Sequence, residues 1–177
     1  MGTLSTERLI LRPVKQDDLK LIYKYASNEN IGPHCGWKPH ENEKESQEIM
    51  DKLFLGKETT WAIALKDDGI FKGVISLEDD PKRNNKHARM IGYWINEADW
   101  GRGYMTEAAK EVLRYAMEDL NAPIVTSNCF TYNDRSRNVI EKTGLKFEGI
   151  MRQAEERYDG KVFDLRMYSI TKEEYFK

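Results

Sequence analysis

Apolar residues recur along this chain with two different spacings, and each spacing predicts one kind of secondary structure. Short apolar runs bounded by Pro, Gly or Asp predict strands at residues 8–13, 59–65, 70–77, 87–95 and 122–130. Apolar positions three and four residues apart predict helices at residues 19–26, 45–55 and 105–120. Residues 145–170 have the pattern of a β-hairpin that turns at Asp159-Gly160.

Polar and turn-forming residues mark where these elements begin and end. Asp17 or Asp18 is placed to cap the first helix, and Asn133 or Asp134 is placed to begin a short helix after the strand at residues 122–130. The segment "IGPHCGWKPH" contains two prolines and two glycines, which break any periodicity and predict a loop. "KDDG" separates two strand-like runs and predicts a tight hairpin turn.

Taken in order, the elements are β-α-α-β-β-β-α-β-α-β-β. This order predicts a single α/β (α+β) domain over residues 1–177, in which about seven strands form a mixed sheet and about four helices cover its faces. The length of 177 residues is sufficient for one domain to bury its own core. No internal repeat, low-complexity tract or linker interrupts this pattern.

Composition and charge narrow the class of protein. Hydrophobic residues make up 40% and charged residues 33%, as in a soluble globular protein. The formal net charge of -2 disfavours a nucleic-acid partner, which needs a basic face to neutralise phosphates. Only two cysteines occur, and the first residues lack the apolar segment of a signal peptide. We therefore expect a cytoplasmic protein without a disulfide framework and without a membrane partner.

The segment "DWGRGYMTEAAK", residues 99–110, places Gly101-Arg102-Gly103 between an expected strand and the clearest helix of the chain. Glycines there allow a ligand to approach the backbone, and the positive end of the helix favours an anion such as phosphate. Taken alone, the spacing of the two glycines is weak evidence and favours a plain tight loop. It also matches neither a P-loop nor a dinucleotide-binding motif.

Several separated motifs agree on one family. "IGYWINEADWGRGYMTEAAKEVLRYA" and the later "NDRSRNVIEKTGLKFEG" resemble the two acetyl-CoA-binding motifs of the GNAT N-acetyltransferases. The opening "LSTERLILRPVKQDDL" and the late "GIMRQAE" resemble the RimJ/RimL branch, named for acetylating ribosomal-protein N-termini. The resemblance covers essentially the whole chain. It implies a GNAT fold with a mostly antiparallel sheet, acetyl-CoA as co-substrate, no metal, and a homodimer as a further expectation.

The resemblance also assigns residues to the cofactor. The loop binds the pyrophosphate through backbone amides, although Trp100 and Met105 stand where the general pattern has a polar and a small residue. The preceding strand pairs with the pantetheine arm, which an asparagine also reaches. The implied cofactor residues are Trp94, Ile95, Gly101, Arg102, Gly103, Tyr104, Met105, Thr106, Asn133 and Ser136.

Acetyl transfer to an amine needs a base, an oxyanion donor and a proton for the leaving thiolate. The match in "MRQAE" implies that Glu155 is the base, whereas composition alone favours a solvated glutamate on a strand edge. The tyrosine that serves as acid in many family members is replaced by Ile140. Ser136 matches the serine of this branch near the sulfur, and capping of its helix is an equal alternative. A backbone N–H near Ile95 is the expected oxyanion donor.

The segment "GWKPH" is expected near the acceptor, so that Trp37 and His40 shape specificity; for Trp37, packing beneath the loop is the stronger alternative. His34, Cys35 and His40 match no usual zinc spacing. Cys129 lies in an apolar strand and is expected to be a core residue.

Two function classes follow. The first is an acetyl-CoA-dependent N-acetyltransferase that uses a direct ternary complex, with a protein N-terminus or a small amine as acceptor. The second is a CoA-binding module without turnover, which Met105 and the missing tyrosine favour.

Overall fold

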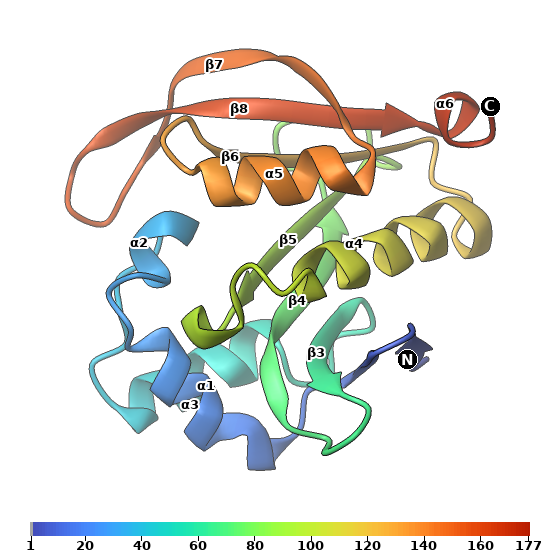
Figure 1. Cartoon of the computed structure of the whole chain (residues 1–177). Coiled ribbons are helices and arrows are strands. Elements are labelled where there is room, and N and C mark those ends of the chain that lie inside the picture. Colours follow the sequence, from blue (N-terminus) through green and yellow to red (C-terminus); the bar gives the residue numbers. More distant parts are fainter. Residues whose placement is uncertain (1) are drawn as a thin grey trace. The chain divides into compact units, whose positions relative to one another are not determined.

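The structure, a computed structural model, describes residues 2–177. Contacts divide the chain into two compact units. Figure 1 shows the helices and strands of both, coloured along the sequence. Unit 1 contains the residues up to Ser76 together with Tyr93–Ala108, and unit 2 contains Leu77–Gly92 together with Ala109–Lys177. Each unit is therefore built from two separate stretches of sequence.

The strands of unit 1 form an antiparallel meander. Each strand pairs with the next along the chain, and the strands are β1 (Leu4–Ser5), β2 (Leu9–Pro13), β3 (Thr60–Leu65) and the first part of β4 (Phe71–Asp79). The expected hairpin at "KDDG" is the β3–β4 connection, and Gly69 in this turn has a φ of +70°. All but one of the β3 residues are buried, which fits their continuous apolar sequence.

Two amphipathic helices of unit 1, α1 (Leu19–Ala26) and α3 (Glu43–Leu53), pack against each other. Asp18 occupies the N-cap position of α1, but its carboxylate accepts from the Lys15 N–H at 2.8 Å and pairs with Arg12 instead of capping the helix. The buried cluster beneath the helices consists of Val14, Ile22, Tyr25, Ile31, Met50, Ala62, Phe71, Val74 and Trp94.

The expectation of a plain loop at residues 31–40 is wrong for its first half, which forms the short helix α2 (Gly32–Cys35). Pro33 lies in the first turn of this helix, where a missing N–H costs nothing. Gly36, with a φ of +90°, ends it. The prolines and glycines therefore bound a helical turn rather than prevent one.

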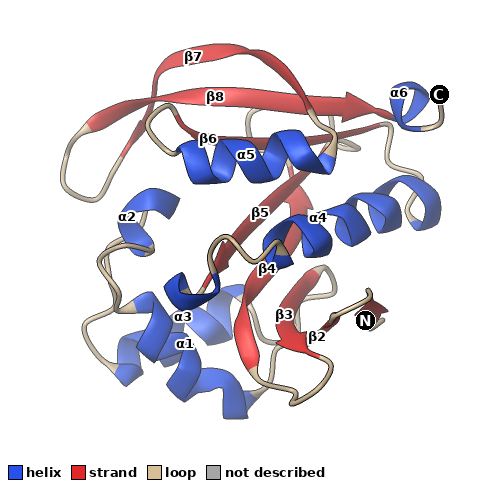
Figure 2. Ribbon diagram, in the orientation of Figure 1, coloured by secondary structure: helices blue, strands red, loops and turns tan. Residues whose placement is uncertain are grey.

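Unit 2 combines helices with strands, two of which form a long antiparallel hairpin. It contains the end of β4, most of β5 (Arg89–Ile95), and the end of α4 (Tyr104–Arg114) followed by the π-helical turn η3 (Tyr115–Asp119). The remaining elements are β6 (Ile124–Phe130), α5 (Asp134–Thr143), β7 (Lys146–Glu156), β8 (Val162–Thr171) and α6 (Lys172–Tyr175). Figure 2 shows β7 and β8 as long neighbouring strands with α5 alongside β6.

The hydrogen-bonded strand order is β1-β2-β3-β4-β5-β6-β8-β7. The β5–β6 pair is parallel, whereas β6–β8 and β7–β8 are antiparallel, so the prediction of a mixed, mostly antiparallel sheet is confirmed. The described residues contain eight strands rather than about seven because the two-residue β1 carries no periodic signal. Additional helices α2 and α6 are single turns, too short for a 3.6-residue repeat to show.

Candidate functional site

The glycine loop lies in unit 1, after the 3₁₀ turn η2 (Glu97–Asp99) and before α4. Gly101 and Gly103 have φ angles of +76° and +80°, the left-handed region that side chains with a Cβ adopt only at a cost. The first N–H groups of α4 have no intrahelical acceptor by geometry and carry the positive end of the helix dipole. The loop can therefore hold an anion through its backbone.

Arg8 of the N-terminal segment holds this loop in place. Its Nη1 donates to the Arg102 carbonyl at 3.1 Å, and its guanidinium carbon lies 4.6 Å from the centroid of the Tyr104 ring. Its Nε donates to Glu107 in the first turn of α4 at 2.7 Å. Burial alone would raise the pKa of Glu107, but hydrogen bonds from Thr6 and Arg8 outweigh it and lower that pKa. Sequence reasoning missed Arg8, because no local pattern relates it to a loop so far along the chain.

Trp100, which replaces the polar first residue of the family pattern, ties the loop to the end of β5. Its indole N–H donates to the Ile95 carbonyl at 3.2 Å. The side chains of Trp94 and Ile95 are each only 8% exposed, so their side chains belong to the core. Met105 is buried as well, and its thioether therefore does not obstruct the loop backbone. Among the other expected cofactor residues, Arg102 is exposed and Thr106 is half-buried.

The segment expected near the acceptor also lies in unit 1. The Trp37 ring lies 5.2 Å from that of His40 and 6.3 Å from that of Trp94, so it joins the end of this loop to β5. His40 is buried, and its Nδ1 lies 2.7 Å from the hydroxyl oxygen of Ser46. Burial lowers the pKa of His40, although the charge of Glu45 acts in the opposite direction.

Asn133 and Ser136 lie at the start of α5 in unit 2. The Asn133 side-chain oxygen caps the helix by accepting from the Ser136 N–H at 3.1 Å. Asn133 therefore makes the cap that was the alternative role of Ser136. The Ser136 hydroxyl hydrogen-bonds the Cys129 thiol, whose pKa burial nevertheless raises to about 11.

Glu155 lies on β7 directly after an irregularity in the β7–β8 register between Met151 and Glu155. Gln153 within it has a φ of +49°, and its N–H donates to Asp164 at 2.8 Å. Such bulges re-aim side chains and are frequent beside active sites. The Glu155 side chain is 37% exposed, and one of its oxygens lies 3.7 Å from Nζ of Lys82. Like the contacts of Arg8, this pairing of Lys82 with Glu155 could not be predicted from the sequence.

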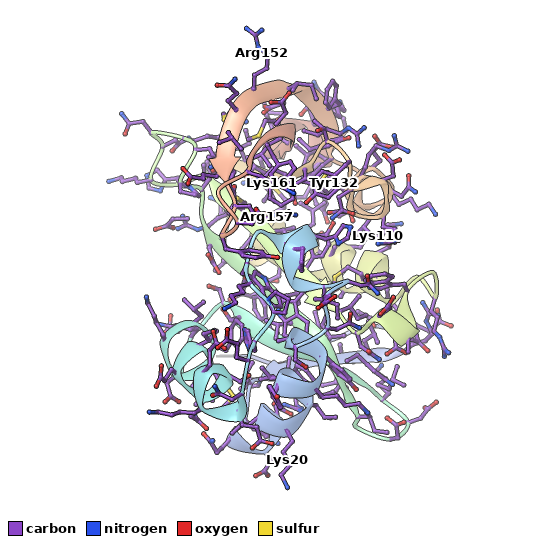
Figure 3. The ribbon with its side chains drawn as sticks, turned by 90° about the vertical axis from the view of Figure 1, so that its left-hand side faces the viewer. Lys20, Lys110, Tyr132, Arg152, Arg157 and Lys161 are labelled. Carbon is purple, nitrogen blue, oxygen red and sulfur yellow. The ribbon has the colours of Figure 1, made fainter. Side chains whose placement is uncertain are left out.

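Near the β7–β8 turn, Arg157 organises a group of aromatic rings. Its Nη1 donates to the Tyr132 hydroxyl at 3.2 Å, and its guanidinium carbon lies 4.7 Å from the centroid of the Phe163 ring. Nη2 of Arg157 also forms an ion pair with Oδ2 of Asp159 at 2.6 Å. In Figure 3 Tyr132, Arg157 and Lys161 lie together in this region, and Arg152 projects away from it. Arg157 thereby ties the hairpin turn to the residue before Asn133.

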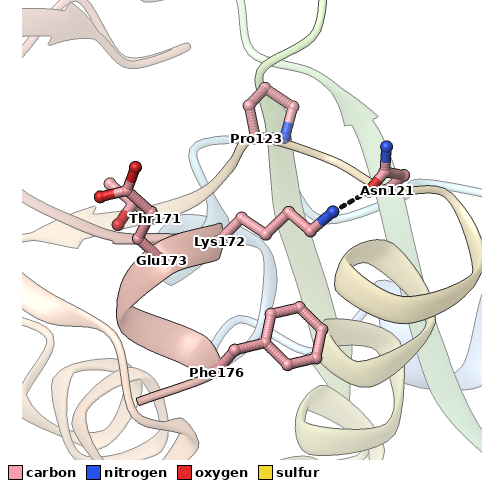
Figure 4. Close-up of a pocket in the computed structure, with 6 residues that line it drawn as sticks. All are labelled: Asn121, Pro123, Thr171, Lys172, Glu173 and Phe176. Carbon is pink, nitrogen blue, oxygen red and sulfur yellow. Dashed lines mark hydrogen bonds between the residues drawn. The ribbon is translucent and has the colours of Figure 1, made fainter.

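Unit 2 has a separate hollow of about 670 Å³ lined by Asn121, Pro123, Thr171, Lys172, Glu173 and Phe176 (Figure 4). The Lys172 ammonium donates to Asn121 across it. None of these residues is among those expected to bind cofactor or acceptor. Over residues 2–177, every helix is too short or too polar to cross a membrane.

Comparison with known proteins places this geometry in a family. Residues 8–146 match the family described as acetyltransferase (GNAT) domain. The uncharacterized N-acetyltransferase YoaA of Bacillus subtilis (strain 168) is 28% identical over 174 residues, which cover 96% of each chain. A GNAT-family acetyltransferase structure from Bacillus anthracis has a TM-score of 0.87 at 23% identity, covering 98% of this chain and 100% of that one. Spermidine N-acetyltransferase from Vibrio cholerae, in complex with CoA and spermine, has a TM-score of 0.76 at 19% identity, covering 96% and 98%.

Proposed function

Because the chain belongs to the GNAT acetyltransferase family, we propose that it transfers an acetyl group from acetyl-CoA directly to a primary amine. The observation that carries this proposal is the glycine loop before α4. Two positive-φ glycines open its backbone, and Arg8 fixes it from outside. A loop held in this way is preorganised for a diphosphate.

For the cofactor, we propose that the residues from Gly101 to Thr106 bind the pyrophosphate through backbone N–H groups. The end of β5 at Trp94 and Ile95 would pair with the pantetheine arm through its backbone, which fits the burial of both side chains. Asn133 and Ser136 would serve the pantetheine and sulfur end. Asn133 and Ser136 both lie at the start of α5, where the Asn133 side-chain oxygen accepts from the Ser136 N–H.

For the chemistry, we propose that Glu155 receives the proton of the acceptor ammonium, directly or through one water. The neutral nitrogen then attacks the thioester carbonyl carbon, and the backbone N–H of Ile95 stabilises the oxyanion. The carbon–sulfur bond breaks, and the thiolate leaves as it takes a proton. Ser136 is the candidate to assist this last step, since Ile140 stands in place of the family's tyrosine.

Direct transfer, rather than an acetyl-cysteine intermediate, is supported by the two thiols. Cys129 is buried, and burial raises the pKa of its thiol to about 11. Cys35 is exposed, but its thiol donates to the Tyr93 carbonyl oxygen at 4.0 Å, a contact that favours the protonated form. The thiolate is the nucleophilic form of cysteine. Neither thiol is therefore prepared for covalent catalysis at neutral pH.

The acceptor is a protein N-terminal α-amine or a small amine. An α-amino group has a pKa of about 7.7–8.0, so a carboxylate is a sufficient base to deprotonate it near neutral pH. An alkylamine with a pKa of about 10.4 is harder to deprotonate. Trp37 is only partly buried beside Trp94 and is the candidate to contact the acceptor. His40 would act beneath it, because its imidazole is buried against Trp37 and Ser46.

A CoA-binding module without turnover remains the second candidate. It is favoured by the absent tyrosine at Ile140 and by Met105, whose side chain is buried. A cytoplasmic location, a homodimer and the action of residues 1–177 as one domain remain predictions from the sequence.

The proposal is tested by thiol release from acetyl-CoA with a panel of short peptides with free N-termini, polyamines and aminoglycosides, together with calorimetric binding of acetyl-CoA. Release above background with one class supports the enzyme and identifies the acceptor class. Binding without release for every amine would favour the CoA-binding module. Absence of binding would contradict the role given to the glycine loop.

A further inference from the structure

The amine group nearest to the proposed base belongs to the protein itself. Nζ of Lys82 lies 3.7 Å from a carboxylate oxygen of Glu155. Lys82 lies at the surface, with its side chain 26% exposed and its ammonium paired with Glu155. A base must lie within hydrogen-bond reach of the amine it deprotonates, directly or through one water. At 3.7 Å the two groups form an ion pair rather than a hydrogen bond, and a movement of less than about 1 Å of either side chain brings the amine within reach of the carboxylate.

The position of Lys82 is built into the segment that connects β4 to β5. Asp80 is buried there and accepts from the Thr126 hydroxyl and from the Lys82 N–H, both at 2.8 Å. Nε of Arg83 lies 3.3 Å from Oδ2 of Asp80, and the same guanidinium forms an ion pair with Glu148 of β7. The residues on either side of Lys82 are thus tied to β6 and β7, which fixes the lysine beside Glu155.

We propose that Lys82 is a self-acetylation site: the enzyme transfers the acetyl group of acetyl-CoA to its own Lys82 when no other acceptor is present. This inference rests on the proposed function and on Glu155 as its base. The Lys82 ammonium loses a proton, and its nitrogen attacks the thioester carbonyl carbon. The carbon–sulfur bond breaks, and CoA leaves as the protonated thiol. The net products are N-acetyl-lysine, free CoA and one proton.

The modification has a consequence for the site. An N-acetyl-lysine carries no charge and cannot form the ion pair with Glu155. Self-acetylation therefore releases Glu155 from Lys82. An acceptor amine then meets a carboxylate without a competing cation.

Lys161 is an internal control within the same unit. Its Nζ also lies 3.7 Å from a carboxylate oxygen, that of Asp159, and its side chain is 70% exposed. Non-enzymatic acetylation favours the more exposed amine, so it predicts faster labelling of Lys161. Self-acetylation through Glu155 predicts faster labelling of Lys82.

The experiment incubates the full chain with acetyl-CoA without acceptor and follows site occupancy at Lys82 and Lys161 by peptide mass spectrometry. Lys82 should be acetylated about 10²-fold faster than Lys161, the lower end of what a positioned base contributes. Glu155→Gln should bring the two rates together, whereas Glu156→Gln should not. Lys82→Arg, which keeps the charge, should abolish thiol release in the absence of acceptor.

Equal or slower labelling of Lys82 in a preparation that releases thiol with an amine would overturn the inference and leave the proposed function intact. Lack of both labelling and thiol release would overturn the two together. Labelling of Lys82 that persists in Glu155→Gln at the wild-type rate would also overturn it, because the site would then not depend on the base.

Discussion

Arg8 and Glu107 are 99 residues apart in sequence, yet they join the N-terminal segment to the first turn of α4. Nε and Nη2 of Arg8 both contact Oε2 of Glu107, at 2.7 and 2.6 Å, and the Arg8 backbone N–H donates to Oε1 at 2.8 Å. The same guanidinium holds the Arg102 carbonyl between the two glycines of the loop. Preorganisation of the anion site thus depends on a residue that does not belong to the loop.

Arg8→Ala should weaken both the fold and the binding of acetyl-CoA. Loss of a half-exposed charged pair costs about 1–2 kcal/mol, which lowers the melting temperature by about 2–4 °C for each kcal/mol. We expect the Kd for acetyl-CoA, measured by calorimetry, to rise about tenfold because the loop loses its fixed geometry. Arg8→Lys keeps the positive charge but lacks the planar guanidinium, so its stability and its Kd should lie between those of the wild type and Arg8→Ala. A wild-type Kd in Arg8→Ala would show that the loop needs no external support.

Comparison of Gly103→Ala with a glycine variant outside the loop should separate the cost of backbone strain from the loss of acetyl-CoA binding. Alanine at a φ of +80° costs about 1–2 kcal/mol, and the new Cβ would lie 3.4 Å from the Arg8 guanidinium. Gly69→Ala is the matched control, with a φ of +70° and no atom within 4 Å of a Cβ. Both variants should lose similar stability in thermal melts, and only Gly103→Ala should bind acetyl-CoA more weakly, by about tenfold. Equal affinities in the two variants would argue against a pyrophosphate site here.

His40 should make the stability of the fold depend on pH just below neutrality. Because burial lowers its pKa in the folded state, the unfolded state binds more protons there. Its contribution is complete above the unfolded pKa of about 6.5 and is lost as the pH falls through the folded value. Melting temperatures from pH 7.5 to 5.5 should therefore fall less in His40→Gln than in the wild type. His87→Gln, at an exposed position, should show the same fall in melting temperature as the wild type. An identical pH dependence of the melting temperature in all three proteins would contradict the role given to His40.

Local patterns predicted the elements that carry the site, and their limits have physical reasons. The apolar periodicity from Met105 onward predicted α4. The positive φ of the two glycines before it is a finding of the structure, since the sequence indicated only that a ligand could approach the backbone there. The end of the same helix was missed, because the π-helical turn Tyr115–Asp119 changes the hydrogen-bond spacing without a break in the apolar stripe.

Contacts between distant segments could not be predicted. Nothing near Arg8 indicates that it reaches Arg102, and nothing near Lys82 indicates that it pairs with Glu155. Likewise, nothing near Asp80 indicates that it is buried and accepts a hydrogen bond from the Thr126 hydroxyl of β6. Such pairs are set by tertiary packing, which one sequence does not encode in its local spacing.

The role of Glu155 as the base of acetyl transfer is tested most directly by the kcat of Glu155→Gln beside that of Glu156→Gln, with the best acceptor from the amine panel. The neighbouring glutamate lies on the same strand and is exposed, so it controls for loss of charge. We predict that Glu155→Gln lowers kcat by about 10²–10⁴-fold with an unchanged Kd for acetyl-CoA, and that Glu156→Gln retains wild-type turnover. A wild-type kcat in Glu155→Gln would contradict the account.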